Sequence, residues 1–220
     1  MRLAVVFTKE APVRFVSHLD VLRLFQRAFR RAKLPLAYSQ GFNPHPLVSF
    51  ATALSVGYTS RGEYLDVTLT EDMSPNDFSE KVNAVLPDGI RIVEVFDLGE
   101  SRKSLTGAMR TAEYSVKINF SESVAENLLA EKLEDLLSGE IIVMKKTKGG
   151  IKPTDIRPMV LSADIAESNG TTAELILKGV LSAEGGLNPD LLLGQLYERL
   201  GVSGEAEIER LNVELDRTAL

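Results

Sequence analysis

The chain has 220 residues, 44% hydrophobic and 25% charged, so it is long enough to bury one large core or two small ones. It contains no cysteine, which excludes disulfides and an iron–sulfur cluster held by its own thiolates. The apolar run near the N-terminus, residues 3–7, is too short for a signal peptide or a membrane span, so we expect a cytoplasmic protein.

The first half of the chain alternates strand and helix patterns. A helix is predicted over residues 17–33, where Ser17 and Asp20 form a capping box, and another over 74–86, where Ser74 is the N-cap. Extended segments are predicted at 3–7, 36–38, 47–54, 63–69 and 90–96. The order is β-α-β-β-α-β with one additional short strand.

The second half repeats this order. A strand at 113–120 precedes a helix that Ser123 and Glu126 cap and that ends at Gly139. The remaining predicted elements are a strand at 141–144, a hairpin over 159–177 that turns at Asn169-Gly170, a helix at 188–201 and a strand at 207–215.

The repeated order is that of the split βαβ motif. We therefore predict an α+β fold made of tandem duplicated ferredoxin-like units with antiparallel sheets. The first unit is assigned to residues 1–100 and the second to residues 112–220. The polar, Gly-containing segment 101–111 is predicted to link them.

Positive charge is concentrated in two segments, although the net charge is -6. Residues 1–70 hold nine Lys and Arg against four Asp and Glu, and residues 145–157 hold five against one. Local potential guides the choice of partner more than net charge does, so a basic face on an acidic protein is compatible with a polyanionic partner.

The predicted helix 17–33 places its arginines on the side opposite its apolar residues. An ordinary solvated face normally mixes acids with bases, whereas this one has a single acid, Asp20, beside Arg23. Such a stripe suits phosphates or carboxylates. The candidate nucleic-acid-binding residues in this part of the chain are Arg14, Arg23, Arg27, Arg30 and Arg31.

Two further segments add candidate contacts. The stretch "YSQGFNPHP" is either a rigid turn or a site for single-stranded nucleic acid, because aromatic rings stack on bases and amides bind base edges. Its candidates are Tyr38, Gln40, Phe42, Asn43 and His45. A basic hairpin, which is either a lysine-protected edge or a polyanion contact, contributes Lys145, Lys146, Lys148, Lys152 and Arg157. We expect these patches to line one shared basic cleft.

Evidence for catalysis is sparse. The sequence has no phosphate loop, nucleophile elbow, HExxH motif or Cys/His zinc spacing, so no metal site is predicted. Its two histidines, His18 and His45, would serve an acid–base reaction only if they met in space, with Tyr38 nearby. By helical position His18 favours a structural role.

The stretches "RFVSHLDVLRLFQRAFRRAKLPLAYSQGFNPHP" and "SFATALSVGYTSRGEYLDVTL" resemble the radical-SAM-linked proteins, a bacterial family of uncharacterised function. The resemblance is dense from Arg14 to Leu69 and looser elsewhere. It implies a radical SAM protein as partner, and an iron–sulfur cluster and S-adenosylmethionine on that partner only. It implies no catalytic residues for this chain.

These observations favour an accessory or substrate-binding module that acts with a radical SAM partner on RNA or an RNA–protein particle and has no catalytic activity of its own. The alternative is a metal-independent RNA-processing or RNA-modifying enzyme that uses His18 or His45. A third hypothesis, a protein-interaction scaffold, predicts an exposed apolar patch instead of a basic groove.

Overall fold

A computed structural model describes residues 1–99, 101, 103–147 and 150–220. The chain divides into two compact units. The first comprises Met1–Arg110 together with Arg210–Leu220, and the second comprises Thr111–Glu209. The C-terminal residues therefore group with the N-terminal half of the chain.

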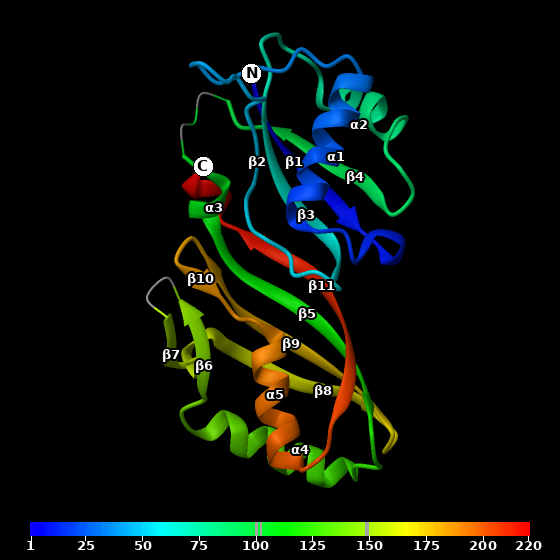
Figure 1. The fold of residues 1–220 in the computed structure, drawn as a ribbon, viewed down its shortest axis with the longest axis vertical. Coiled ribbons are helices and arrows are strands. Elements are labelled where there is room, and N and C mark those ends of the chain that lie inside the picture. The colour runs from blue at the N-terminus through cyan, green and yellow to red at the C-terminus, as the bar shows by residue number, and fades with distance from the viewer. Residues whose placement is uncertain (100, 102, 148–149) are drawn as a thin grey trace. The chain divides into compact units, whose positions relative to one another are not determined.

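The first unit is a mostly antiparallel sheet with helices α1 and α2 and the short helix α3 (Figure 1). Strand β1 pairs with both β3 and β4, and β2 pairs with β3, in each case antiparallel. The strand order is β11-β3-β1-β4. The elements are β1 (Arg2–Lys9), α1 (His18–Arg31), β2 (Val48–Phe50), β3 (Thr59–Thr68), α2 (Pro75–Asn83), β4 (Ile90–Asp97), α3 (Leu105–Ala108) and the end of β11 (Gly204–Leu215), with short 3-10 turns at Ala11–Val13 and Arg217–Ala219.

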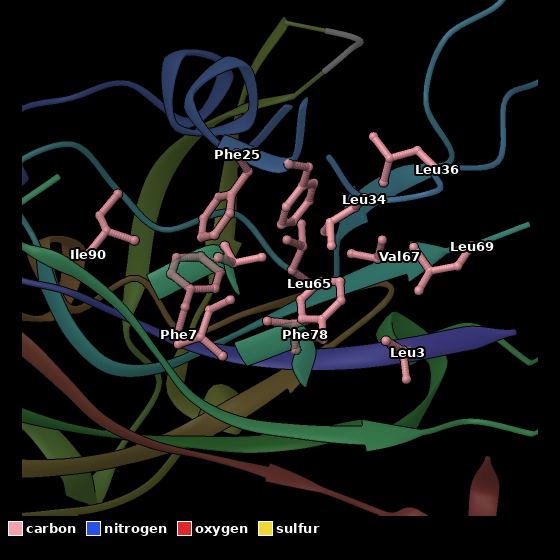
Figure 2. Packing of buried hydrophobic residues seen from close by; sticks show 14 of the residues in the cluster. Leu3, Phe7, Phe25, Leu34, Leu36, Leu65, Val67, Leu69, Phe78 and Ile90 are labelled. Carbon is pink, nitrogen blue, oxygen red and sulfur yellow. The ribbon is translucent and has the colours of Figure 1, made fainter. Parts of the chain in front are cut away.

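Helices α1 and α2 cover one face of this sheet, and the core of the unit lies between them and the strands. Phe25 of α1 lies edge-on to Phe7 of β1, with ring centroids 4.7 Å apart (Figure 2). Phe29 of α1 packs against Phe78 of α2, with ring centroids 5.6 Å apart. Alternate strand residues complete the cluster, as period-2 alternation requires; they are Leu3, Val5, Leu65, Val67, Leu69, Ile90 and Ile92.

Helix α1 begins where the capping box predicts. The Asp20 amide donates to Ser17 Oγ at 3.2 Å, and the Ser17 hydroxyl donates to the Asp20 carboxylate at 2.7 Å. The first of these bonds satisfies one of the amide groups that the first turn of a helix leaves without a partner, and the second joins the two side chains. The cap therefore fixes where the arginine-bearing helix starts.

The second unit is also an antiparallel sheet with two helices. Strands β5 and β8 both pair antiparallel with β9, and the order is β10-β9-β5-β11. A separate two-stranded hairpin, β6 with β7, is inserted after α4. The elements are β5 (Met109–Phe120), α4 (Glu126–Ser138), β6 (Ile142–Thr147), β7 (Gly150–Asp155), a 3-10 turn (Arg157–Met159), β8 (Val160–Ser168), β9 (Thr172–Ser182), β10 (Gly185–Gly186), α5 (Pro189–Leu200) and the start of β11.

The mixed α and β composition and the mostly antiparallel pairing are confirmed, and the duplication of a ferredoxin-like unit stays a prediction.

The predicted turn at Asn169-Gly170 is confirmed, since Gly170 has φ +92 between β8 and β9. The predicted cap at Ser123 is wrong: α4 begins at Glu126 with Ala125 as N-cap and no side-chain bond. Part of the segment predicted as a linker forms α3, whose Leu105 is buried.

Candidate functional site

The outward face of α1 is an arginine surface, formed by Arg23, Arg27, Arg30 and Arg31, all of which are exposed. Arg23 binds Asp20 at 2.9 Å, and both side chains are more than half exposed. The hydrogen bond from Ser17, and then the one from Arg23, lower the pKa of Asp20. Within the part of the chain that the structure describes, the other three arginines form no ion pair. Their charge is therefore available to a ligand.

Arg14 lies before α1 and differs from the arginines on the helix. Its guanidinium carbon stands 4.8 Å from the ring centroid of Phe15, whose side chain is 70% exposed. This contact is a cation–π interaction at the surface. The stacked pair presents a flat, cationic surface, which is chemically suited to a nucleobase or a phosphate.

The loop from Tyr38 to Pro46 is preorganised by its own hydrogen bonds. Tyr38 and Pro46 form an isolated β-bridge, and Ser39 Oγ lies 2.9 Å from His45 Nδ1 and 3.1 Å from the His45 amide, which donates to it. Gly41 has φ +123, a conformation that favours glycine. The candidates Gln40, Phe42, Asn43 and His45 are exposed, and Tyr38 is 45% exposed. The loop thus holds aromatic and amide groups outward.

An open groove of 300 Å³ lies next to this loop. It is lined by His45, by Arg2 with its partner Asp66, and by Pro46, Leu47, Val48, Ser49 and Thr68. The Arg2 guanidinium donates to the Asp66 carboxylate and to the carbonyl of Ser101 at 2.6 Å. The groove therefore combines a fixed ion pair with hydroxyl and imidazole groups, all within the first unit.

The basic hairpin belongs to the second unit. Lys146 and Lys152 are exposed, Lys145 is half-buried, and Lys148 lies outside the described residues. Arg157 has a structural role, since its guanidinium donates to the carbonyls of Leu137 at 2.6 Å and Val160 at 2.8 Å. Because the hairpin and the arginine surface lie in different units, a single shared basic cleft stays a prediction.

His18 and His45 line different cavities. His18 is the first residue of α1 and stacks on Phe50, with ring centroids 4.7 Å apart. Burial lowers the pKa of His18, and the nearby Glu63 carboxylate opposes that effect. The two histidines are not brought to one cavity, so the structure gives the shared acid–base site no geometric support.

A buried charged cluster in the first unit was missed by the sequence patterns. Lys9, Glu63 and Arg210 are 3–4% exposed. One Arg210 nitrogen donates to both Glu63 oxygens at 2.9 Å and to Thr52 Oγ1 at 3.2 Å. Lys9 donates to the carbonyls of Arg14 at 2.8 Å and Tyr58 at 3.4 Å.

Strand alternation contains a signal for two of these residues. Lys9 is in phase with Phe7 and the other inward residues of β1, and Glu63 is in phase with Leu65 of β3. A charged side chain at an inward strand position indicates a paired or functional group, because burying an unpaired charge is costly. Burial lowers the pKa of Lys9, and Glu63 opposes that effect.

A model of a protein family described as "uncharacterized protein conserved in bacteria (DUF2344)" matches residues 2–189, which is well over half of the chain. The chain belongs to this bacterial family. Nothing in the match links the family to radical SAM enzymes, so that association stays a prediction. A search of curated proteins finds no match.

Solved structures share the fold at low sequence identity. A chain of a Cbf5-Nop10-Gar1 complex has a TM-score of 0.56 and 12% identity, covering 96% of this chain and 48% of that one. A chain of an archaeal box H/ACA sRNP Nop10-Cbf5 complex has a TM-score of 0.52 and 11% identity, covering 94% of this chain and 46% of that one. A chain of an H/ACA RNP bound to a substrate RNA containing 2′-deoxyuridine has a TM-score of 0.53 and 13% identity, covering 96% of this chain and 47% of that one. The chain spans about half the length of these chains, and the likeness shows the fold alone.

The described residues contain no helix long and apolar enough to cross a membrane. They also contain no group of three or more His, Cys, Asp or Glu side chains placed to hold a metal ion.

Proposed function

We propose that the chain is an RNA-binding accessory module that presents RNA or an RNA–protein particle to a radical SAM partner. The main support for RNA binding is the arginine surface of α1, where Arg27, Arg30 and Arg31 are exposed and form no ion pair among the described residues. Like charges on one helix face repel each other, and bound phosphates would relieve that repulsion.

The loop from Tyr38 to Pro46 follows α1 in sequence and supplies aromatic rings and amides, which the arginine surface lacks. Arginines bind the phosphate backbone, whereas unstacked bases need rings and amides. Phe42 and Tyr38 offer exposed rings, and Gln40 and Asn43 offer amides, on a loop that His45 and Ser39 hold in place. This combination supports single-stranded RNA over a duplex.

The fold likeness supports an RNA-related role. Of the three similar chains at a TM-score above 0.5, one comes from a box H/ACA sRNP complex and one from an H/ACA RNP bound to a substrate RNA, and the third comes from a Cbf5-Nop10-Gar1 complex. We extend RNA binding to this chain on the strength of the arginine surface and the loop together with that fold. We also propose a cytoplasmic location, which is where a bacterial protein meets RNA.

We further propose that each unit is ferredoxin-like. In the first unit the order is β4-β1-β3, with β2 on β3, and in the second it is β11-β5-β9, with β8 on β9. If the separate hairpin β6-β7 and the two-residue β10 are left out of the second unit, both orders are fourth, first, third, second strand, which supports a duplicated split βαβ plan. An experimental structure with another strand order in either unit would contradict the proposal.

The RNA proposal predicts salt-dependent binding of single-stranded RNA by the wild-type chain. Titration of a fluorescent single-stranded RNA across a salt series is expected to give a linear fall of log affinity with log salt, with a slope of about -0.7 for each phosphate contacted. Duplex RNA of the same sequence is the comparison and is expected to bind more weakly. Absence of binding at low salt, or affinity that salt does not change, would refute RNA binding.

The partner proposal is tested separately, because this chain has no cysteine to hold an iron–sulfur cluster. The tagged full chain, purified without oxygen from a bacterial host that encodes a radical SAM protein beside it, is expected to retain that protein, with iron and sulfide in the complex. Mass spectrometry and metal analysis measure both. Recovery of the chain alone at every salt concentration would contradict a stable partnership and leave RNA binding unaffected.

A further inference from the structure

A small pocket in the first unit lies at the N-terminal end of α1. It is lined by Lys9, His18, Thr52, Glu63 and apolar side chains from Phe7, Val16, Val21, Phe50 and Leu54. Its volume of 20 Å³ exceeds the roughly 10–15 Å³ that one water needs, so it has room for a group the size of one oxygen atom. A nucleobase does not fit into this volume.

The buried ammonium of Lys9 shares the one acid that lines the pocket with a second cation. That acid is Glu63, and the second cation is Arg210, which is buried nearby but does not line the pocket. Arg210 already binds both oxygens of that carboxylate. The burial that lowers the pKa of His18 disfavours a charge on its ring. Lys9 therefore shares the Glu63 carboxylate with Arg210, and a buried ammonium in this situation is stabilised by an added anion.

The polar groups around the pocket are mainly donors. The Lys9 ammonium has three protons, of which the carbonyls of Arg14 and Tyr58 accept two. Thr52 Oγ1 accepts from Arg210, so its own hydroxyl proton is available to another acceptor. The apolar walls lower the local dielectric constant and so strengthen any charge-assisted bond formed inside. This arrangement suits an anionic oxygen.

Charge and steric access favour one kind of phosphate as the source of that oxygen. A phosphodiester inside an RNA strand has one negative charge and a sugar on each side, whereas a terminal phosphate has only one sugar and a charge of about -1.5 to -2 near pH 7. The terminal group therefore offsets a buried cation better and approaches a narrow pocket with less hindrance. We infer that this pocket binds an oxygen of a terminal phosphate of RNA, next to the helix whose arginines hold the strand. The inference rests on the proposed RNA binding, and it adds recognition of an RNA end.

The test compares three single-stranded RNAs of one sequence, carrying a 5′-phosphate, a 3′-phosphate or only hydroxyl ends. One of the phosphorylated RNAs is expected to bind the wild type about tenfold or more tightly than the hydroxyl RNA, as for one charge-assisted bond. Lys9→Met is expected to remove this preference, and Thr52→Val to reduce it. Lys81→Met, which removes an exposed lysine of α2, is the matched control and is expected to keep it.

Competition with inorganic phosphate tests whether tighter binding of the phosphorylated RNA comes from its phosphate occupying the pocket. Added at constant ionic strength, inorganic phosphate is expected to abolish the advantage of the phosphorylated RNA without releasing the hydroxyl RNA. Release of both RNAs to the same extent would indicate general competition and overturn the pocket assignment. Equal affinity of the wild type for all three RNAs would also overturn it, while leaving RNA binding intact. If no RNA binds, both proposals fail.

Folding of the variants is checked by circular dichroism and thermal melting before binding is measured. Lys9 is buried, so Lys9→Met changes packing as well as charge. Thr52→Val keeps the side-chain shape and removes only the hydroxyl group, which makes it the second, milder probe. A folded Thr52→Val protein with an undiminished preference for the phosphorylated RNA would contradict the donor role of Thr52.

Discussion

Glu63→Gln is expected to destabilise the protein by about 3–5 kcal/mol, because it leaves Arg210 buried without a countercharge. The two side chains are both 5% exposed and lie 2.9 Å apart. Lys9, also buried nearby, adds to the repulsion that the carboxylate now balances. Urea unfolding followed by circular dichroism measures the change as a shift of the midpoint.

An exposed ion pair in the same unit provides the control. Arg217 and Glu94 also lie 2.9 Å apart, but their side chains are 59% and 47% exposed. Glu94→Gln is expected to cost no more than about 1 kcal/mol, since exposed pairs are screened by solvent. Similar effects of the two substitutions would show that burial does not set the strength of the Glu63–Arg210 pair.

A double variant tests whether the stability lost in Glu63→Gln comes from the charge on Arg210. Glu63→Gln combined with Arg210→Met is expected to be more stable than Glu63→Gln alone, because the second change removes the charge left without a partner. Lack of recovery would mean that Arg210 stabilises the fold mainly through its other contacts, which include Thr52 Oγ1 at 3.2 Å.

Local sequence signals predicted the elements that local interactions determine. Ser17 and Asp20 specify the start of α1 by bonds within one turn, and Gly170 provides the conformation that the turn between β8 and β9 requires. The same kind of signal failed at Ser123, which is followed by an extended Ala125 before α4 begins. A capping pattern indicates a possible start, and the packing of the following residues decides which start is used.

Residues whose roles depend on distant partners could not be placed from the sequence. The sequence predicts Arg157 to belong to a basic hairpin, yet its guanidinium donates to the carbonyl of Leu137, 20 residues earlier. Glu63 and Arg210 are 147 positions apart, and no local pattern connects them. The exposure of the α1 arginines, by contrast, follows from helical period alone, because the opposite face carries Phe25 and Phe29.

Reversal of two charges on the arginine surface is expected to have the largest effect on RNA binding. Arg27→Glu with Arg31→Glu removes two phosphate contacts and adds repulsion, so the affinity for single-stranded RNA should fall by about tenfold or more at low salt. The salt slope should become shallower by about 1.4, which corresponds to two contacts at about 0.7 each. Fluorescence titration over a salt series measures both quantities.

The matched control is Lys81→Glu with Arg91→Glu, which makes the same change of net charge at exposed positions of α2 and β4 in the same unit. If the arginine surface binds the RNA, this variant should retain nearly the wild-type slope, because slope counts released counterions and therefore local contacts. Equal losses in the two variants would instead indicate that only the overall charge matters. The arginines of α1 would then be an ordinary solvated face, and the assignment of the RNA-binding surface would be wrong.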